Sequence, residues 1–341
     1  MHVTALIDPS TERANEVLAE KRASPAARAY ADAAVYPSIA AFLASVTPET
    51  APHAIWIGSP PAFRGGQQAG RDVELVLTEA LPQTALFVEK PVTTGPLAES
   101  QYVSEQLAAR PNVVAVGYML RYLAVVQKMK EIIRENNLTV MAINARYINA
   151  YENIVKLWWW DKTHSLGPII EQATHFCDLM RYLGGEVELD SVHAYTVEAD
   201  EPAGRLSKVP EGESGLAADV RIPRITCATW KFENGAVGSL THAVALHGAR
   251  FATELDVYAD GFLLRLVDPY NDPVLYVRRP SSEDEEEHRF PGDDPFYTEA
   301  ANMVDCAERG RGAAPLYSSF DDAVKTYALT WAIRLASERQ R

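Results

Sequence analysis

Basic residues, cysteines and long apolar runs are all scarce in this chain. It has 32 Lys and Arg against 46 Asp and Glu, a net charge of -14, which excludes the clustered positive surface that nucleic acid or an anionic membrane requires. Its three cysteines, Cys177, Cys227 and Cys306, have neither close spacing nor metal-ligand spacing, so we expect no disulfide and no metal site. No stretch could span a membrane and the amino terminus shows no basic leader, so we expect a cytoplasmic protein that binds a small molecule.

The first part of the chain alternates short apolar runs with helical patterns. The runs that predict buried strands are Val3–Ile7, Ala54–Gly58, Thr84–Val88 and Val113–Gly117. Helical patterns cover Thr11–Lys21, the surroundings of Ile39 and of Val73, Leu97–Ala108 and Leu123–Arg134. This alternation predicts an α/β domain over residues 1–122, a Rossmann-like parallel sheet with covering helices.

After Asn137 the strand patterns predominate. They cover Thr139–Tyr147, Asp190–Val197, Ile225–Phe232, Gly238–Val244, Thr253–Tyr258 and Phe262–Val267, with hairpin signals at Asn234-Gly235 and Asp260-Gly261. The acidic run Ser282–His288 predicts a solvated loop, because like charges cannot be buried unpaired. Two helices are expected near Pro295–Arg309 and Asp321–Arg339. We therefore predict a second, α+β domain over residues 123–341 with a mostly antiparallel open sheet.

Lys90 lies in Glu89-Lys90-Pro91, directly after the predicted strand Thr84–Val88. Ligands of open α/β sheets bind outside the carboxyl ends of the strands, so an ammonium group at this place can meet a reacting atom. Pro91 fixes the backbone next to the lysine. The tripeptide alone is a weak signal, and its position at the strand end is what strengthens it.

A second polar stretch, Glu171–Asp178, opens a predicted helix. At 3.6 residues per turn Glu171, His175 and Asp178 share one face, and an acid one turn from an imidazole suits proton transfer. Structural interpretations stay open, because His175 can be a hydrogen-bonded core residue and Asp178 can pair with Arg181 or another arginine. A cation held by the three side chains is less favoured, since enzymes usually gather metal ligands from separate elements.

In this order, and with the change from a parallel to an antiparallel sheet, the chain resembles the Gfo/Idh/MocA family of NAD(P)-dependent oxidoreductases over nearly its whole length. The resemblance rests on Val88–Pro91, Tyr118–Tyr122, Trp159–Lys162 leading into Glu171–His175, and Asp294–Glu299. It implies a dinucleotide-binding domain, followed by a domain whose open sheet holds a sugar, cyclic polyol or diol and joins subunits into homo-oligomers.

The resemblance also implies roles for particular residues. Lys90 would polarise the reacting oxygen, His175 would act as general acid and base, and Glu171, where many relatives have Asp, would orient its neighbours. The implied cofactor contacts are Asp8 at the ribose, Ser59 and Pro60 on the nicotinamide side, and Glu89 and Lys90. The implied substrate contacts are Arg121, Trp160 and Lys162, and no metal is implied. Asp8 favours NAD over NADP because its charge repels a 2′-phosphate.

Three departures from the family pattern stand out. Arg64 replaces a frequent His and Ser165–Pro168 replaces a more glycine-rich stretch, and both are expected to tune the substrate pocket. The third departure is that the sequence opens at what matches the family's second strand, without the first strand, the G-x-G-x-x-G turn and the first helix. That unit holds the pyrophosphate and is central in the sheet. Either the neighbouring strands close up or the natural protein is longer, and we expect impaired dinucleotide binding.

The leading hypothesis is hydride transfer between NAD(P) and a CH-OH or carbonyl group of a sugar-like, polyol or other small polar substrate. Two alternatives stay open: a cofactor-independent isomerase or lyase that uses the same acid and base groups, and a catalytically silent binding subunit. Turnover of NAD(P)H selects the first hypothesis and conversion without cofactor the second, whereas assembly without turnover selects the third.

Overall fold

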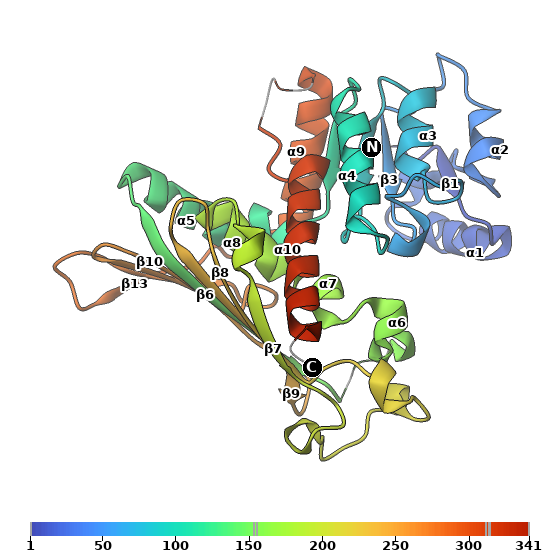
Figure 1. Cartoon of the computed structure of the whole chain (residues 1–341). Coiled ribbons are helices and arrows are strands. Elements are labelled where there is room, and N and C mark those ends of the chain that lie inside the picture. Colours follow the sequence, from blue (N-terminus) through green and yellow to red (C-terminus); the bar gives the residue numbers. More distant parts are fainter. Residues whose placement is uncertain (1, 153, 155, 311, 313–314, 340–341) are drawn as a thin grey trace.

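The parallel strands of the first domain form two sheets. The computed structural model describes residues 2–339 apart from 153, 155, 311, 313 and 314 (Figure 1). One sheet pairs β1 (Ala5–Ile7) with β2 (Ala34–Tyr36), and the other has the order β3 (Ala54–Ile57), β4 (Ala85–Val88) and β5 (Val114–Val116). The helices between them are α1 (Thr11–Arg22), α2 (Ile39–Leu43), α3 (Val73–Ala80) and α4 (Leu97–Ala108). All pairings are parallel, which confirms the predicted α/β class.

The two parallel sheets are separate at the place where the resemblance implies a further strand between them. In the part of the chain that the structure describes, β1 pairs only with β2 and β3 only with β4, so the neighbouring strands have not closed up. The two units touch through α2, whose Ile39 and Leu43 pack against the core around Leu77 and Val88. Each unit therefore ends in an edge strand with one side unpaired.

The second domain is built on one eight-stranded sheet in the order β13-β12-β11-β10-β6-β9-β8-β7. The strands are β6 (Val140–Ala150), β7 (His193–Val197), β8 (Ile225–Lys231), β9 (Val237–Leu246), β10 (Ala252–Ala259), β11 (Phe262–Val267), β12 (Val274–Arg278) and β13 (Glu285–His288). All neighbours are antiparallel except the central pair β6 and β9. This arrangement confirms the predicted, mostly antiparallel sheet.

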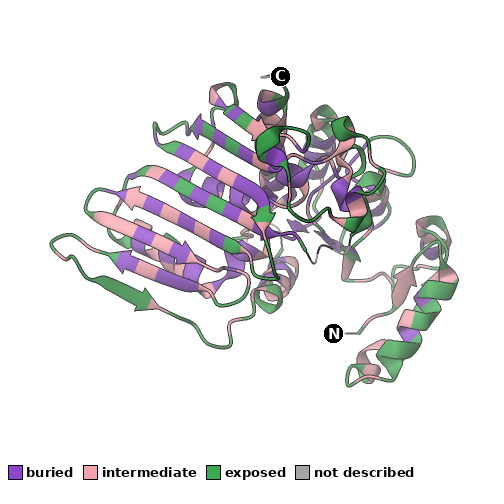
Figure 2. Ribbon diagram, turned by 90° about the horizontal axis from the view of Figure 1, so that it is seen from below, coloured by how far each residue is buried: buried purple, intermediate pink, exposed green. Residues whose placement is uncertain are grey.

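Helices cover one face of this sheet and leave the other open. The covering helices are α5 (Ala124–Glu135), α8 (Thr174–Gly184) and part of α10 (Phe320–Glu338), and the core between them and the sheet includes Met129, Phe176 and Ile333. Buried and exposed residues alternate along the strands, which appear as bands in Figure 2. This period of two is what a sheet with one covered face requires.

The acidic run is where the sequence prediction for this sheet was wrong. Glu285–His288 form the edge strand β13 instead of a loop, paired with β12. An edge strand needs hydrogen bonds on one side only, so its charged side chains can stay in solvent. Arg279 lies 2.8 Å from Glu286 and Arg265 lies 3.5 Å from Glu285, which offsets part of the negative charge.

The final helices, α9 (Pro295–Arg309) and α10, return to the first domain. Met303 of α9 packs against Phe87, and α10 lies between the two halves of the protein (Figure 1). Tyr327 of α10 belongs to the parallel-sheet core and Leu329 to the core of the large sheet. The predicted boundary at 122/123 falls just before α5, but by packing the returning tail belongs to both domains. None of the described helices is long and apolar enough to cross a membrane.

Candidate active site

Lys90 lies at the junction of the two domains. It follows β4 and precedes a cis peptide bond to Pro91, and its Nζ donates a hydrogen bond of 2.9 Å to the main-chain oxygen of Glu171. Burial lowers the pKa of Lys90, while the nearby Glu171 carboxylate acts in the opposite direction. The lysine therefore links the carboxyl end of the parallel sheet to the second predicted stretch.

That second stretch is not one helix. The short helix α7 (Pro168–Glu171) ends at Glu171, Gln172 and Ala173 form a turn, and α8 begins only at Thr174. The prediction that Glu171, His175 and Asp178 share one helix face is wrong, because the turn separates Glu171 from α8. The Glu171 carboxylate accepts a 2.9 Å hydrogen bond from the Trp159 indole and lies 3.7 Å from Lys156 Nζ.

His175 is positioned by aromatic rings. Tyr118 and Tyr270 each meet the imidazole edge to face, with ring centroids 6.0 Å away. Its Nδ1 is buried and has no hydrogen-bond partner among the described residues. Burial and the charge of Lys90 lower the pKa of His175 well below its ordinary value, so the ring is neutral at pH 7. Nothing in the described contacts ties Glu171 to this ring. Sequence reasoning missed Tyr270, and it quoted Tyr118 only as part of the stretch Tyr118–Tyr122, without placing it beside His175.

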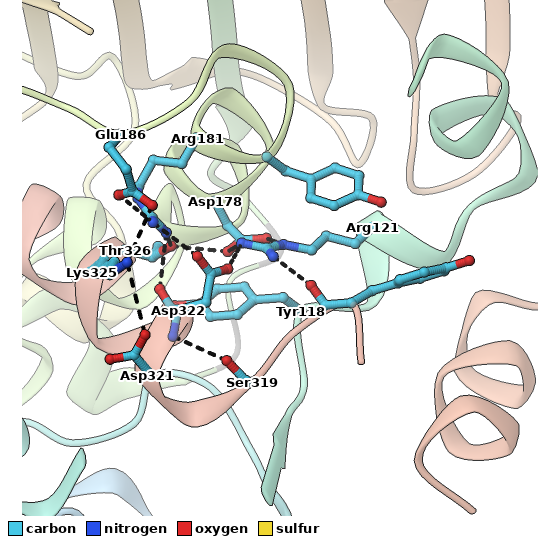
Figure 3. Close-up of polar contacts among 12 residues, drawn as sticks. Tyr118, Arg121, Asp178, Arg181, Glu186, Ser319, Asp321, Asp322, Lys325 and Thr326 are labelled. Carbon is cyan, nitrogen blue, oxygen red and sulfur yellow. Dashed lines mark hydrogen bonds and ion pairs between the residues drawn. The ribbon is translucent and has the colours of Figure 1, made fainter. Parts of the chain in front are cut away.

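Asp178 belongs to a buried ion-pair network (Figure 3). Both carboxylate oxygens of Asp178 accept 2.6 Å hydrogen bonds from Arg121, and Thr326 donates to Asp178 at 2.9 Å. Arg121 also pairs with Asp322 of α10. This is the structural alternative in which Asp178 pairs with an arginine. Arg121 is 3% exposed, so the structure places this implied substrate contact in the interior with its charge already matched.

The other two implied substrate contacts, Trp160 and Lys162, have no described contact with His175. Trp160 is 1% exposed and packs in a small apolar cluster with Tyr151 and Ile222. Lys162, which begins α6 (Lys162–Ser165), lies 3.6 Å from Glu198. The tryptophan that is connected to the site is Trp159, whose indole donates a hydrogen bond to Glu171. Sequence alone does not show which side of a three-tryptophan run faces a site.

The implied cofactor residues follow the carboxyl ends of three parallel strands. Asp8 is exposed after β1, Ser59 and Pro60 come shortly after β3, and Glu89 directly follows β4. Ser59 Oγ is buried and unpartnered among the described residues, and a Cβ at Gly58 would meet no atom within 4 Å. An unmet hydroxyl beside open backbone fits a ligand that approaches closely.

Arg64 has a different role from the expected tuning of the substrate pocket. It is 1% exposed and donates to the main-chain oxygens of Ser59 at 2.6 Å and Pro91 at 2.8 Å. Burial lowers the pKa of its guanidinium to about 10, with Glu74 and Glu89 acting against that change. Arg64 therefore holds together the two loops that carry Ser59 and Lys90.

Replacing Glu171 by Gln is expected to lower the pKa of Lys90. The carboxylate opposes the effect of burial, so without it Lys90 loses its proton at a lower pH. If the protonated lysine binds the reacting oxygen, the alkaline limb of the kcat/KM profile moves to lower pH. Glu131→Gln, which removes the partner of Lys128 on α5, is the control. A shift of the acidic limb instead would mean that Glu171 acts on His175.

Comparison with known proteins gives matches that cover nearly the whole chain. Residues 1–118 match the oxidoreductase family with an NAD-binding Rossmann fold (Gfo/Idh/MocA), and residues 121–262 match an oxidoreductase C-terminal domain. Uncharacterized protein UNK4.17 of Schizosaccharomyces pombe is 44% identical over 336 residues, which cover 98% of this chain and 82% of the yeast protein.

Two solved structures share the fold. Levoglucosan dehydrogenase in complex with NADH and levoglucosan superposes with a TM-score of 0.77 at 18% identity, covering 100% of this chain and 89% of its own. The super-repressor mutant of Gal80p from Saccharomyces cerevisiae has a TM-score of 0.74 at 14% identity, covering 100% and 89%. At these identities the likeness concerns the fold alone.

Proposed function

We propose, since this chain belongs to the Gfo/Idh/MocA family of oxidoreductases, that it transfers a hydride between NAD(P) and a CH-OH or carbonyl carbon of a neutral, sugar-like or polyol substrate. The observation that carries this proposal is the meeting of Lys90, at the end of β4, with the turn before α8, beside a neutral His175. A cation and a neutral base at one place are what oxidation of an alcohol needs.

The roles of the two groups follow from their surroundings. With Nδ1 sealed, Nε2 is the His175 nitrogen that can take the proton of the substrate hydroxyl. The Lys90 ammonium can donate to the same oxygen as negative charge develops on it, in an environment that burial makes less screening. The nicotinamide of a bound dinucleotide supplies the hydride acceptor, or the donor in the reverse direction.

The substrate class is supported by the site and by one relative of known fold. Levoglucosan dehydrogenase, whose solved complex holds levoglucosan, an anhydro sugar, has the same architecture. In this chain the half-buried Tyr270 borders the imidazole, and aromatic rings suit the apolar faces of a sugar ring. We therefore favour cyclic sugars and polyols over acyclic acids.

The experiment is an absorbance assay for NADH formation with levoglucosan, D-glucose and myo-inositol. Formation of NADH in proportion to oxidised product supports the proposal. Conversion of a sugar without NAD(P) would select the isomerase or lyase alternative, and the absence of any conversion by a folded protein would select the silent binding subunit.

We propose NAD as the preferred cofactor, and weak binding of it, because a dinucleotide would touch two separate parallel sheets whose described contacts run through α2. The Asp8 carboxylate is exposed at the end of β1 and would repel a 2′-phosphate. Calorimetric titration is expected to give a Kd for NAD weaker than micromolar, and a still weaker one for NADP. Micromolar or tighter binding of NAD would contradict the first expectation, and Asp8→Ser without loss of discrimination would contradict the second.

We also propose that two copies of this chain associate through the open face of the large sheet in the cytoplasm. The face carries exposed Tyr195 and Val237 among outward ion pairs such as Arg146 with Glu254. Sedimentation that gives only a monomer at micromolar concentration would contradict the association. No disulfide joins any of the described cysteines, which suits a reducing compartment.

A further inference from the structure

Helix α8 is fastened to the first domain along one side. Its first residue, Thr174, shares a hydrogen bond of 2.8 Å with the Tyr118 hydroxyl. One turn later, Asp178 is bound by Arg121. The apolar side of α8, which includes Phe176, packs into the core of the large sheet instead. Residues four apart in a helix face the same way, so α8 presents its polar side to the first domain.

The hydrogen bond between Tyr118 and Thr174 is sealed from solvent. Thr174 is 0% exposed and Tyr118 is 1% exposed, and neither hydroxyl has a second hydrogen bond among the described residues. Burial raises the pKa of Tyr118, so its hydroxyl stays protonated and able to donate. Breaking the bond would leave buried hydroxyls without a partner, which is costly, so the two residues stay together.

Tyr118 also connects the two groups to which chemistry is assigned. Its ring meets the His175 imidazole edge to face, with centroids 6.0 Å apart and planes at 85°. Tyr118 directly follows Gly117, whose main-chain nitrogen donates to the oxygen of Val88, two residues before Lys90. Through the paired strands β4 and β5, Tyr118 therefore rests on the same sheet edge as Lys90.

The His175 ring needs support of this kind. Imidazoles that act as bases are commonly oriented by a hydrogen bond at the nitrogen that does not react. In this chain Nδ1 of His175 has no hydrogen-bond partner among the described residues, so the orientation of the ring depends on packing and on the place of α8. A side chain that is 1% exposed cannot touch the substrate, so any effect of Tyr118 on the reaction passes through Thr174 and His175.

We propose that Tyr118 is a positioning residue for the reaction, which fixes the His175 imidazole relative to Lys90 through its hydrogen bond to Thr174 and its ring contact. This inference rests on the proposed function and adds to it a residue that acts from the interior. Lys90 and His175 are then assembled before a ligand binds, because both are held by the carboxyl edge of one sheet.

The test removes the two hydroxyls one at a time and together. Tyr118→Phe and Thr174→Val keep the shape of each side chain and lose the hydrogen bond. With levoglucosan, D-glucose or myo-inositol we expect kcat to fall about tenfold in each variant while KM stays within about twofold, because a displaced base slows the chemical step without weakening substrate binding. The double variant should be no slower than either single variant, since all three lack the same bond.

Two controls separate positioning from stability. Thr330→Val also removes a buried hydroxyl from a helix, because Thr330 Oγ1 donates at 2.7 Å to the main-chain oxygen of Tyr327, and it should leave kcat unchanged. Thr174→Ser keeps the hydroxyl and should keep kcat within about twofold of the parent value. A kcat as low in Thr174→Ser as in Thr174→Val would overturn the inference, and so would losses that add up in the double variant.

The imidazole is observed beside turnover, by NMR of the His175 Cε1–H signal, which is identified by its absence in His175→Gln. Broadening or splitting of this signal in Tyr118→Phe and Thr174→Val, without NADH formation by the parent protein, would support this inference and overturn the proposed function. A sharp signal with unchanged kcat in both variants would overturn the inference and leave the function standing. If Tyr118→Phe does not fold, the comparison of Thr174→Val with Thr174→Ser decides.

Discussion

Replacing Lys90 by Met is expected to lower kcat about 10²- to 10³-fold, the usual effect of removing one donor that stabilises a developing oxyanion. Methionine keeps the length of the side chain and loses the hydrogen bond to the Glu171 main-chain oxygen together with the charge. Removal of a desolvated ammonium costs little packing, so the melting temperature should hardly change.

Steady-state kinetics and thermal unfolding of the same preparation check this result. Lys128→Met is the matched control, because Lys128 pairs with Glu131 on the outside of α5 and lies apart from the site. A variant with normal kcat would assign Lys90 a structural role. An unfolded variant whose surviving fraction keeps normal activity would do the same.

Replacing Arg121 by Met is expected to lower the free energy of unfolding by about 3–5 kcal/mol, because it leaves a buried charge without its partner. Asp178 is 1% exposed, and among the described residues it would keep the hydrogen bond from Thr326 and the attraction of the Arg181 charge. Denaturation by urea measures the change. Arg13→Met, which breaks the exposed pair with Glu16, is the control and should cost no more than about 0.5 kcal/mol.

The pH dependence of that loss has a definite sign. Burial raises the pKa of Asp178 and Arg121 opposes the rise, so the pKa climbs further when Arg121 is removed. A carboxyl group with a raised pKa in the folded state destabilises that state only at a pH high enough to ionise it. The free energy of unfolding lost in Arg121→Met should therefore be smaller at pH 5 than at pH 8. A double variant, Arg121→Met with Asp178→Leu, should recover part of the stability. A loss that is equal at both pH values would show that packing, not charge, is what Arg121 supplies.

The elements that the sequence predicts well are those whose patterns are local. Leu97–Ala108 and Pro295–Arg309 form helices α4 and α9 with the predicted bounds, because their apolar spacing and flanking residues are sufficient. The turns at Gly235 and Gly261 have φ of 89° and 71°, as the Asn-Gly and Asp-Gly pairs indicate. The short strand β2 was not predicted, because three residues are too few to show the alternation of buried and exposed positions that indicates a strand.

The site was predicted less completely, since its geometry depends on contacts between distant segments. Lys90 and the turn at Glu171 meet, but the break after Glu171 changes what the carboxylate contacts. Neither the amino-acid composition nor the hydrophobic periodicity shows that Arg121 forms an ion pair with Asp178. The same holds for the hydrogen bonds that Arg64 donates to three main-chain oxygens. Arginine and tryptophan serve interiors and sites equally well, so only the fold tells the two uses apart.

The break between the two parallel sheets has a consequence for how a dinucleotide is held. Asp8 belongs to the β1–β2 unit, whereas Ser59 and Lys90 belong to the β3–β5 unit, and the described contacts between these units run through the small apolar surface of α2. A ligand that touches both units must also hold them in one relative position. The free energy that this ordering costs reduces the favourable free energy of binding that the contacts supply. Cofactor affinity in this protein is therefore a property of the joint between the two units as much as of the residues that touch the cofactor.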